Sequence, residues 1–122
     1  MRMLVVALSV AAVTPAHAAT PQMPSELVGQ WCRVEGSKFV RAKNFCRADR
    51  SIVIIVHKYG FFIKNLRARY RMMCVPLEID YGSDGWTVTT ACGADDNSTP
   101  IEKGEFTFES GSDPNKMSIV YK

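Results

Sequence analysis

The chain has few of the residue patterns on which enzymes depend. It contains two histidines, His17 and His57, and we expect His17 to be removed with an N-terminal leader. No serine lies in the G-x-S-x-G pattern that presents a nucleophile. His57 therefore has no predicted nucleophile to activate, and we interpret it as a packed or rim residue of a strand. The sequence favours a protein that is not an enzyme.

Closely spaced metal ligands are also missing. The four cysteines are Cys32, Cys46, Cys74 and Cys92. They form no C-x-x-C pair, which zinc sites commonly use. Residues 80–85 loosely resemble a calcium loop, but Gly82 takes the third ligand position and Ala91 the twelfth. We predict a turn there, and no metal or cofactor.

Long apolar runs are confined to the N-terminus. Arg2 precedes an apolar run at 3–13, and Ala16-His17-Ala18 offers small residues where a signal peptidase reads them. We expect residues 1–18 to be a signal peptide cleaved after Ala18. No segment is long enough to cross a bilayer as a helix. The prediction is a soluble protein that is periplasmic or secreted.

An even cysteine count in an exported domain indicates two disulfides, for which three connectivities exist. We favour Cys32–Cys46 and Cys74–Cys92, because each pairing closes a short local loop. In the chain-entropy model, closing the loop from 32 to 46 contributes about 3 kcal/mol. Such cross-links suit a single small domain with a modest core.

No sustained apolar repeat at helical spacing occurs after residue 18, and most segments alternate with period two. Residues 51–58 are nearly all apolar, which predicts a strand covered on both faces. We interpret 37–49 as a long connection, Tyr59-Gly60 and Ser83-Asp84-Gly85 as turns, and Pro76 as a bulge or a corner. The alternation directs these side chains to the core: Trp86, Val88, Thr90, Cys92, Phe106, Phe108, Met117, Ile119 and Tyr121.

These signals predict an all-β fold, a small antiparallel up-and-down β-barrel of seven or eight strands with two disulfides. Residues 19–25 hold two prolines and no apolar periodicity, so we expect an extended N-terminal arm. The barrel domain is predicted at 26–122, with a polar loop at 94–100.

Charges of opposite sign separate along the chain. Residues 19–73 hold eleven Lys and Arg against three Asp and Glu, whereas 74–122 hold three against nine. One interpretation is that basic strands pair with acidic strands and are neutralised. The other is a basic face for an anionic partner, such as a lipopolysaccharide, a polyanionic glycan or an acidic protein. Nothing resembles a nucleic-acid-binding module.

Three arginines, Arg67, Arg69 and Arg71, alternate with apolar residues in a segment predicted to be a strand. Neighbours on one strand face are separated by roughly 6.6 Å, so the guanidinium groups would form a comb. If Glu105 and Glu109 lie opposite these arginines, the comb only pairs charges across the sheet. If the comb faces solvent, it is a candidate site for an anion or a partner.

Residues 26–31, read as E-L-x-G-Q-W after a proline-containing arm, resemble the start of small periplasmic inhibitors of serralysin-type metalloproteases. G-x-W also resembles the opening of lipocalin-like barrels. The resemblance implies an eight-stranded barrel in which Trp31 plugs one end and Gly29 permits close packing. It also implies an inhibitory arm that enters the protease cleft, formed here by Ala19, Thr20, Pro21, Gln22 and Met23. The whole chain is similar to small exported four-cysteine proteins of unknown role.

We therefore expect an exported, non-enzymatic binding protein. One hypothesis is an inhibitor or envelope-protection factor that acts on another protein through its arm or a loop. The alternative is a carrier of a small or anionic ligand, such as a lipid or glycan, through the barrel mouth or the basic face. A purely structural envelope role is a third. Small barrels are usually filled by side chains, which favours binding to a protein.

Overall fold

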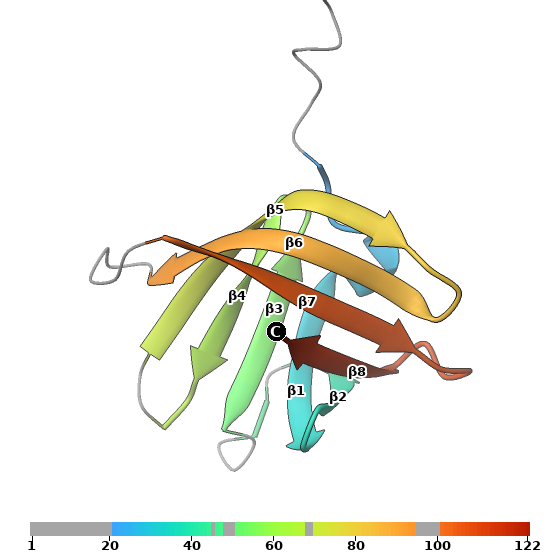
Figure 1. Cartoon of the computed structure of the whole chain (residues 1–122). Helices are drawn as coiled ribbons and strands as arrows, with labels where there is room; N and C mark the ends of the chain where they lie inside the picture. The colour runs from blue at the N-terminus through green and yellow to red at the C-terminus, as the bar shows by residue number, and fades with distance from the viewer. Residues whose placement is uncertain (1–20, 45, 48–50, 68–69, 95–100) are drawn as a thin grey trace, which may run out of the picture.

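The computed structural model describes residues 21–44, 46–47, 51–67, 70–94 and 101–122. In these segments eight antiparallel strands close into a barrel (Figure 1). The elements are η3 (Ser25–Leu27), β1 (Gly29–Glu35), β2 (Lys38–Ala42), β3 (Ile52–His57), β4 (Gly60–Asn65), β5 (Tyr70–Tyr81), β6 (Gly85–Ala94), β7 (Glu102–Ser110) and β8 (Lys116–Tyr121). The predicted barrel is confirmed. The expected signal peptide and most of the loop expected at 94–100 lie outside the described residues.

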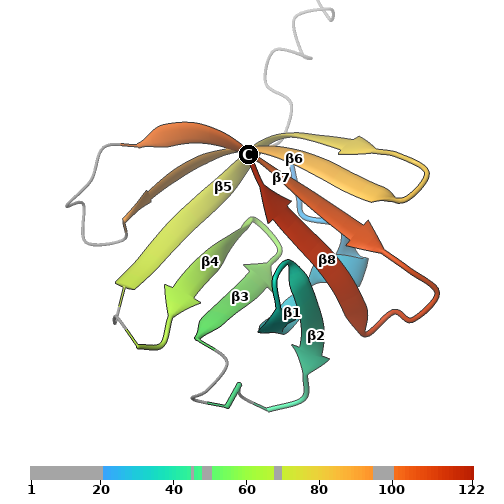
Figure 2. The same ribbon diagram turned by 60° about the horizontal axis from the view of Figure 1, so that its bottom comes forward.

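Strands β3 to β8 follow one another around the barrel, and the β1–β2 hairpin closes it (Figure 2). Within that hairpin β1 lies beside β3, and β2 lies beside β8. The connection from β2 to β3 must therefore cross β1. The disulfide Cys32–Cys46 joins β1 to this connection. Both cysteines pack with Val53 in a small cluster separate from the main core.

Both disulfides have the favoured connectivity, Cys32–Cys46 and Cys74–Cys92. The interpretation of 37–49 as a connection is wrong over its first part, because Lys38–Ala42 forms β2. β2 forms its ladder with β1 and β8. Its partner β8 lies near the end of the chain, so this pairing is not visible in the local sequence.

The interior is packed with apolar side chains from every strand. Aromatic rings meet at its centre, where Phe61 lies edge-on to Phe106 at 5.0 Å and to Phe108 at 5.6 Å between centroids. Inward predictions are confirmed for Val88, Thr90, Cys92, Phe106, Phe108, Met117 and Ile119, which are buried. Tyr121 was expected to be buried and is 55% exposed, because the last strand ends there. Its ring still contacts Phe106 at 4.7 Å.

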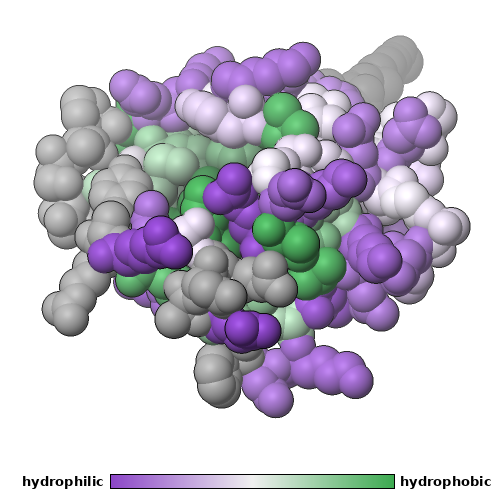
Figure 3. Space-filling view, turned by 90° about the horizontal axis from the view of Figure 1, so that it is seen from below, coloured by the Kyte–Doolittle hydropathy of each residue, from purple (hydrophilic) through white to green (hydrophobic). Residues whose placement is uncertain are grey.

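β5 is the longest strand and changes register at the predicted bulge, between Pro76 and Glu78. Before the bulge β5 pairs with β4, and beyond it the strand continues along β6 alone. Apolar surface is not confined to the interior. Seen from below, apolar residues reach the surface between polar ones (Figure 3).

Candidate functional site

One end of the barrel is closed by residues that precede β1. Met23 and Leu27 are buried and belong to the main core. The backbone N–H of Met23 donates to the carbonyl of Lys58 at 2.8 Å, which ties this segment to the β3–β4 turn. Trp31 is fully buried, and its indole N–H donates to the carbonyl of Leu27 at 2.9 Å. This hydrogen bond ties the short helix η3 to the indole of Trp31.

Arg41 completes this closure from β2. Its guanidinium lies over the Trp31 ring, 4.4 Å from the centroid. Nη1 donates to the carbonyl of Val28 and Nη2 to that of Glu26, both at 2.7 Å. A side chain at Gly29 would obstruct this arrangement, because its Cβ would lie 2.7 Å from Nη1 of Arg41. Gly29, the glycine of the G-x-W pattern, therefore leaves space for the guanidinium of Arg41.

The N-terminal arm is shorter than expected. Ala19 and Thr20 lie outside the described residues, and Gln22 is exposed. Met23 is only 4% exposed and packs in the core, so the segment predicted to be an arm is anchored to the barrel at this residue. An arm that enters another protein consists of residues before Met23. Its inhibitory role stays a prediction.

The arginine comb does not form as expected. Arg67 lies in the turn after β4, and β5 begins only at Tyr70. Arg69 lies outside the described residues. Arg71 is exposed in β5, directly opposite Lys64 of β4. Arg67 and Arg71 therefore do not share one strand face, because Arg67 lies in the turn before β5.

Glu105 and Glu109 do not lie opposite Arg71, as the sheet-pairing interpretation of the comb required. Glu105 and Glu109 lie on β7, and β6 separates that strand from β5. Glu105 instead has Thr89 opposite it and lies 4.0 Å from the ammonium group of Lys122. Lys64 and Arg71 thus place two positive charges opposite each other on β4 and β5.

The outer face of β3, β4 and β5 carries exposed apolar side chains. Ile55 pairs with Phe62, and Phe62 pairs with Met73, so their side chains share one face of the sheet. Val75 continues this face along β5, and Tyr59 joins it from the β3–β4 turn. We call these five residues the apolar strip. Tyr59 is 55% exposed, Met73 45% and Val75 38%.

A groove of about 560 Å³ lies along one end of the apolar strip. It is lined by the β3–β4 turn and by β5 from Met73 to Val75. Gly60 brings the two strands close together, because a Cβ there would lie 2.5 Å from the carbonyl oxygen of Cys74. A side chain at Gly60 would therefore push β4 and β5 apart at the groove.

Cations border the strip and groove. The Lys58 ammonium lies 5.4 Å from the centre of the Tyr59 ring, and the Arg71 guanidinium lies 4.8 Å from that of Phe62. Contacts of this kind contribute about 0.5–1 kcal/mol at exposed sites. They hold positive charge against the rings of the strip. The combined surface can take apolar groups together with negative charge.

Lys64→Glu is expected to stabilise the protein. Lys64 and Arg71 are like charges directly opposite each other on neighbouring strands, an arrangement that destabilises a sheet. Charge reversal should raise the free energy of unfolding by about 0.5 kcal/mol, and less at high salt. Thermal denaturation at two salt concentrations measures this. Lys116→Glu is the matched control, because Lys116 has Val40 opposite it. If Lys64→Glu and Lys116→Glu change the stability equally, the like-charge pairing of Lys64 with Arg71 is contradicted.

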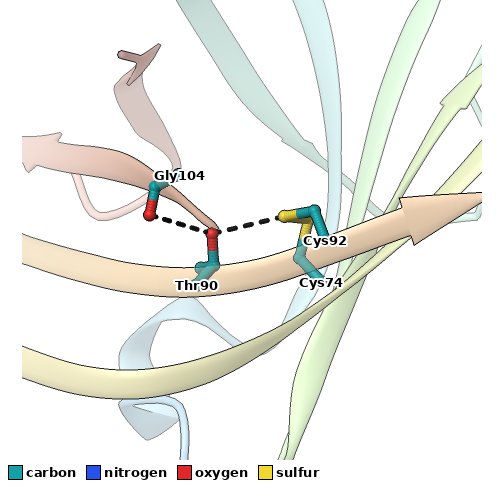
Figure 4. The surroundings of a disulfide bond; sticks show 4 residues. All are labelled: Cys74, Thr90, Cys92 and Gly104. Atoms are coloured by element: carbon teal, nitrogen blue, oxygen red, sulfur yellow. Dashed lines mark hydrogen bonds between the residues drawn. A yellow bond between two sulfur atoms is a disulfide. The ribbon is translucent and has the colours of Figure 1, made fainter. Parts of the chain in front are cut away.

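The disulfide Cys74–Cys92 lies beneath the apolar strip, on the inner face of β5 and β6. Cys74 is fully buried and Cys92 is 6% exposed. The hydroxyl of Thr90 donates to the carbonyl of Gly104 at 3.2 Å, and its oxygen lies 3.2 Å from Sγ of Cys92 (Figure 4). Strands β5, β6 and β7 are thus joined below the strip by a covalent bond and a buried hydroxyl.

The apolar strip and its groove are the candidate site. Within the described ranges, no group of three or more His, Cys, Asp and Glu side chains is placed to hold a metal ion. No helix among the described residues is long and apolar enough to cross a membrane. Comparisons of the chain with protein-family models, with curated proteins and with solved structures found no match.

Proposed function

We propose that the protein is a non-enzymatic binding protein that acts on another protein, and that it docks through the apolar strip and groove. The observation that carries this proposal is the exposure of Tyr59, Met73 and Val75 together on the outside of the barrel. Contiguous exposed apolar surface on a soluble protein commonly marks an interaction site. Cations at its border add electrostatic selectivity for the partner.

The position of the N-terminal arm supports an inhibitor as the specific form of this function. Lys58 lines the groove, and its carbonyl accepts the hydrogen bond from the backbone of Met23. The described residues before Met23, which are Pro21 and Gln22, therefore lie next to the turn that lines the groove. A partner that covers the groove would also meet the arm. We propose that the partner is a secreted protease whose cleft receives the arm.

The alternative of an internal ligand carrier has less support. Phe61, Phe106 and Phe108 pack against one another at the centre of the barrel. Trp31 and the segment before it cover one end. Barrels of eight strands have just enough interior to be filled by side chains. Binding at the outer surface requires none of this packing to change.

We also propose that the protein works in the periplasm or is secreted. Two disulfides are compatible with an oxidising compartment outside the cytoplasm. The proposal is tested by fractionating cells that produce the chain and determining the mature N-terminus. Processing after Ala18 and recovery outside the cytoplasm are expected.

The inhibitor proposal is tested by titrating secreted proteases, a serralysin-type zinc enzyme among them, with oxidised protein that begins at Ala19. We expect stoichiometric inhibition of at least one enzyme. Inhibition should weaken at least about tenfold when the chain begins at Met23, and likewise in Met73→Glu. Val120→Glu introduces the same charge on the outer face of β8 and should leave inhibition unchanged. No inhibition at micromolar concentration would reject the inhibitor.

A further inference from the structure

We infer that the apolar strip recognises a partner segment that is both acidic and apolar. This inference rests on the proposed function, because it names the chemistry of the protein that docks there. It follows from the order of side chains on the outer face of the sheet. Three rows cross the strands there, each set by the register of the ladder.

The central row is apolar, and cations lie on both sides of it. Ile55, Phe62 and Met73 form the central row. On one side, Lys64 and Arg71 form the next row. Rows two residues apart on a strand are separated by about 6.7 Å. One row of positive charge therefore runs parallel to the apolar row within reach of the same ligand.

The other side of the central row is also positive. Val75 has Ala91 opposite it on β6, and Ala91 has Lys103 opposite it on β7, so Lys103 continues this third row. Lys58 borders the row at the β3–β4 turn. None of the described residues in these three rows across β3, β4 and β5 is acidic. Negative charge on β5 begins beyond the bulge, at Glu78.

The complement of this surface is an apolar stripe with carboxylates on both sides. An amphipathic helix about 10–12 Å wide presents such a stripe, and its width is close to the roughly 13 Å that three rows span. A flat anionic membrane would contact the convex barrel wall but would not fill the concave groove at Gly60. The groove therefore favours a protein segment over a lipid surface.

A random library of peptides of about twelve residues, displayed on phage and selected against the oxidised protein, tests this inference. Selected peptides should combine apolar residues with an excess of Asp and Glu. Their dissociation constants should rise at least about tenfold with Lys64→Glu and with Met73→Glu, and they should rise with salt. Lys116→Glu and Val120→Glu are the controls matched in charge. Co-sedimentation with phosphatidylglycerol vesicles is measured in parallel.

The outcomes separate the inference from the proposed function. Selected peptides that need Met73 but carry no acidic excess would overturn the inference and leave docking at the strip intact. Peptides unaffected by Met73→Glu, or no enrichment, would overturn both. Sedimentation with anionic vesicles that is lost in Lys64→Glu would contradict the inference by assigning the face to a lipid surface. Thermal denaturation of each variant verifies that the barrel is folded.

Discussion

Trp31→Ala is expected to lower the free energy of unfolding by about 4 kcal/mol, as measured by chemical denaturation. The side chain is fully buried and is covered by Leu27 of η3. Its removal leaves a cavity at the closed end of the barrel. It also takes away the ring over which the guanidinium of Arg41 lies. Few other single substitutions combine the loss of so much buried surface with the loss of a cation contact.

Two further variants are compared with Trp31→Ala to show how much of the lost stability comes from the closed end of the barrel. Trp31→Phe keeps a ring beneath Arg41 but loses the hydrogen bond to Leu27, and it should cost less than Trp31→Ala. Trp86→Ala removes a partly exposed tryptophan that contacts Tyr81 at the β5–β6 hairpin, and it should cost less as well. A loss below about 1 kcal/mol in Trp31→Ala would contradict the closure that Trp31 and Arg41 form.

The double variant Cys74→Ala, Cys92→Ala is expected to lose about 3–4 kcal/mol of stability. Its two cysteines are separated by 18 residues, and a disulfide of this span contributes about 3 kcal/mol by restricting the unfolded chain. Both sulfur atoms also lie in the main core, so their removal leaves a small cavity. Denaturant titration of the oxidised protein and the variant gives the difference.

The disulfide Cys32–Cys46 provides the matched comparison. Its separation of 14 residues predicts nearly the same entropic contribution. Its sulfur atoms lie in the smaller outer cluster with Val53, so the packing loss should be smaller. The double variant at 32 and 46 is therefore expected to be somewhat more stable than the one at 74 and 92. The reverse order would contradict the assignment of Cys74–Cys92 to the main core.

Much of the barrel follows from local patterns in the sequence. Alternation placed Val88, Phe106 and Phe108 inside, because successive side chains of a strand point to opposite faces. Pro76 marked the bulge of β5, because proline cannot donate to the ladder. Short spacing favoured the two disulfides that the structure contains. Each of these inferences depends only on residues that are close to one another in the sequence.

The parts that were missed depend on contacts between distant segments. Arg41 contributes to the closed end from β2, a strand that also pairs with β8 near the end of the chain. The apolar strip requires the register of three strands, which no local pattern supplies. A signal existed nevertheless in the doublets Phe61-Phe62 and Met72-Met73. Adjacent strand residues face opposite ways, so one member of each doublet must lie outside the barrel.

Docking at the apolar strip is tested by mapping amide chemical shifts in the labelled, oxidised protein as a selected acidic peptide is added. If the peptide docks at the apolar strip, the largest changes fall on Gly60–Asn65 and on the part of β5 that holds Met73 and Val75. Changes on Lys116–Tyr121 should be small. Changes centred on β7 and β8, or spread through the buried aromatic residues, would contradict docking at the apolar strip.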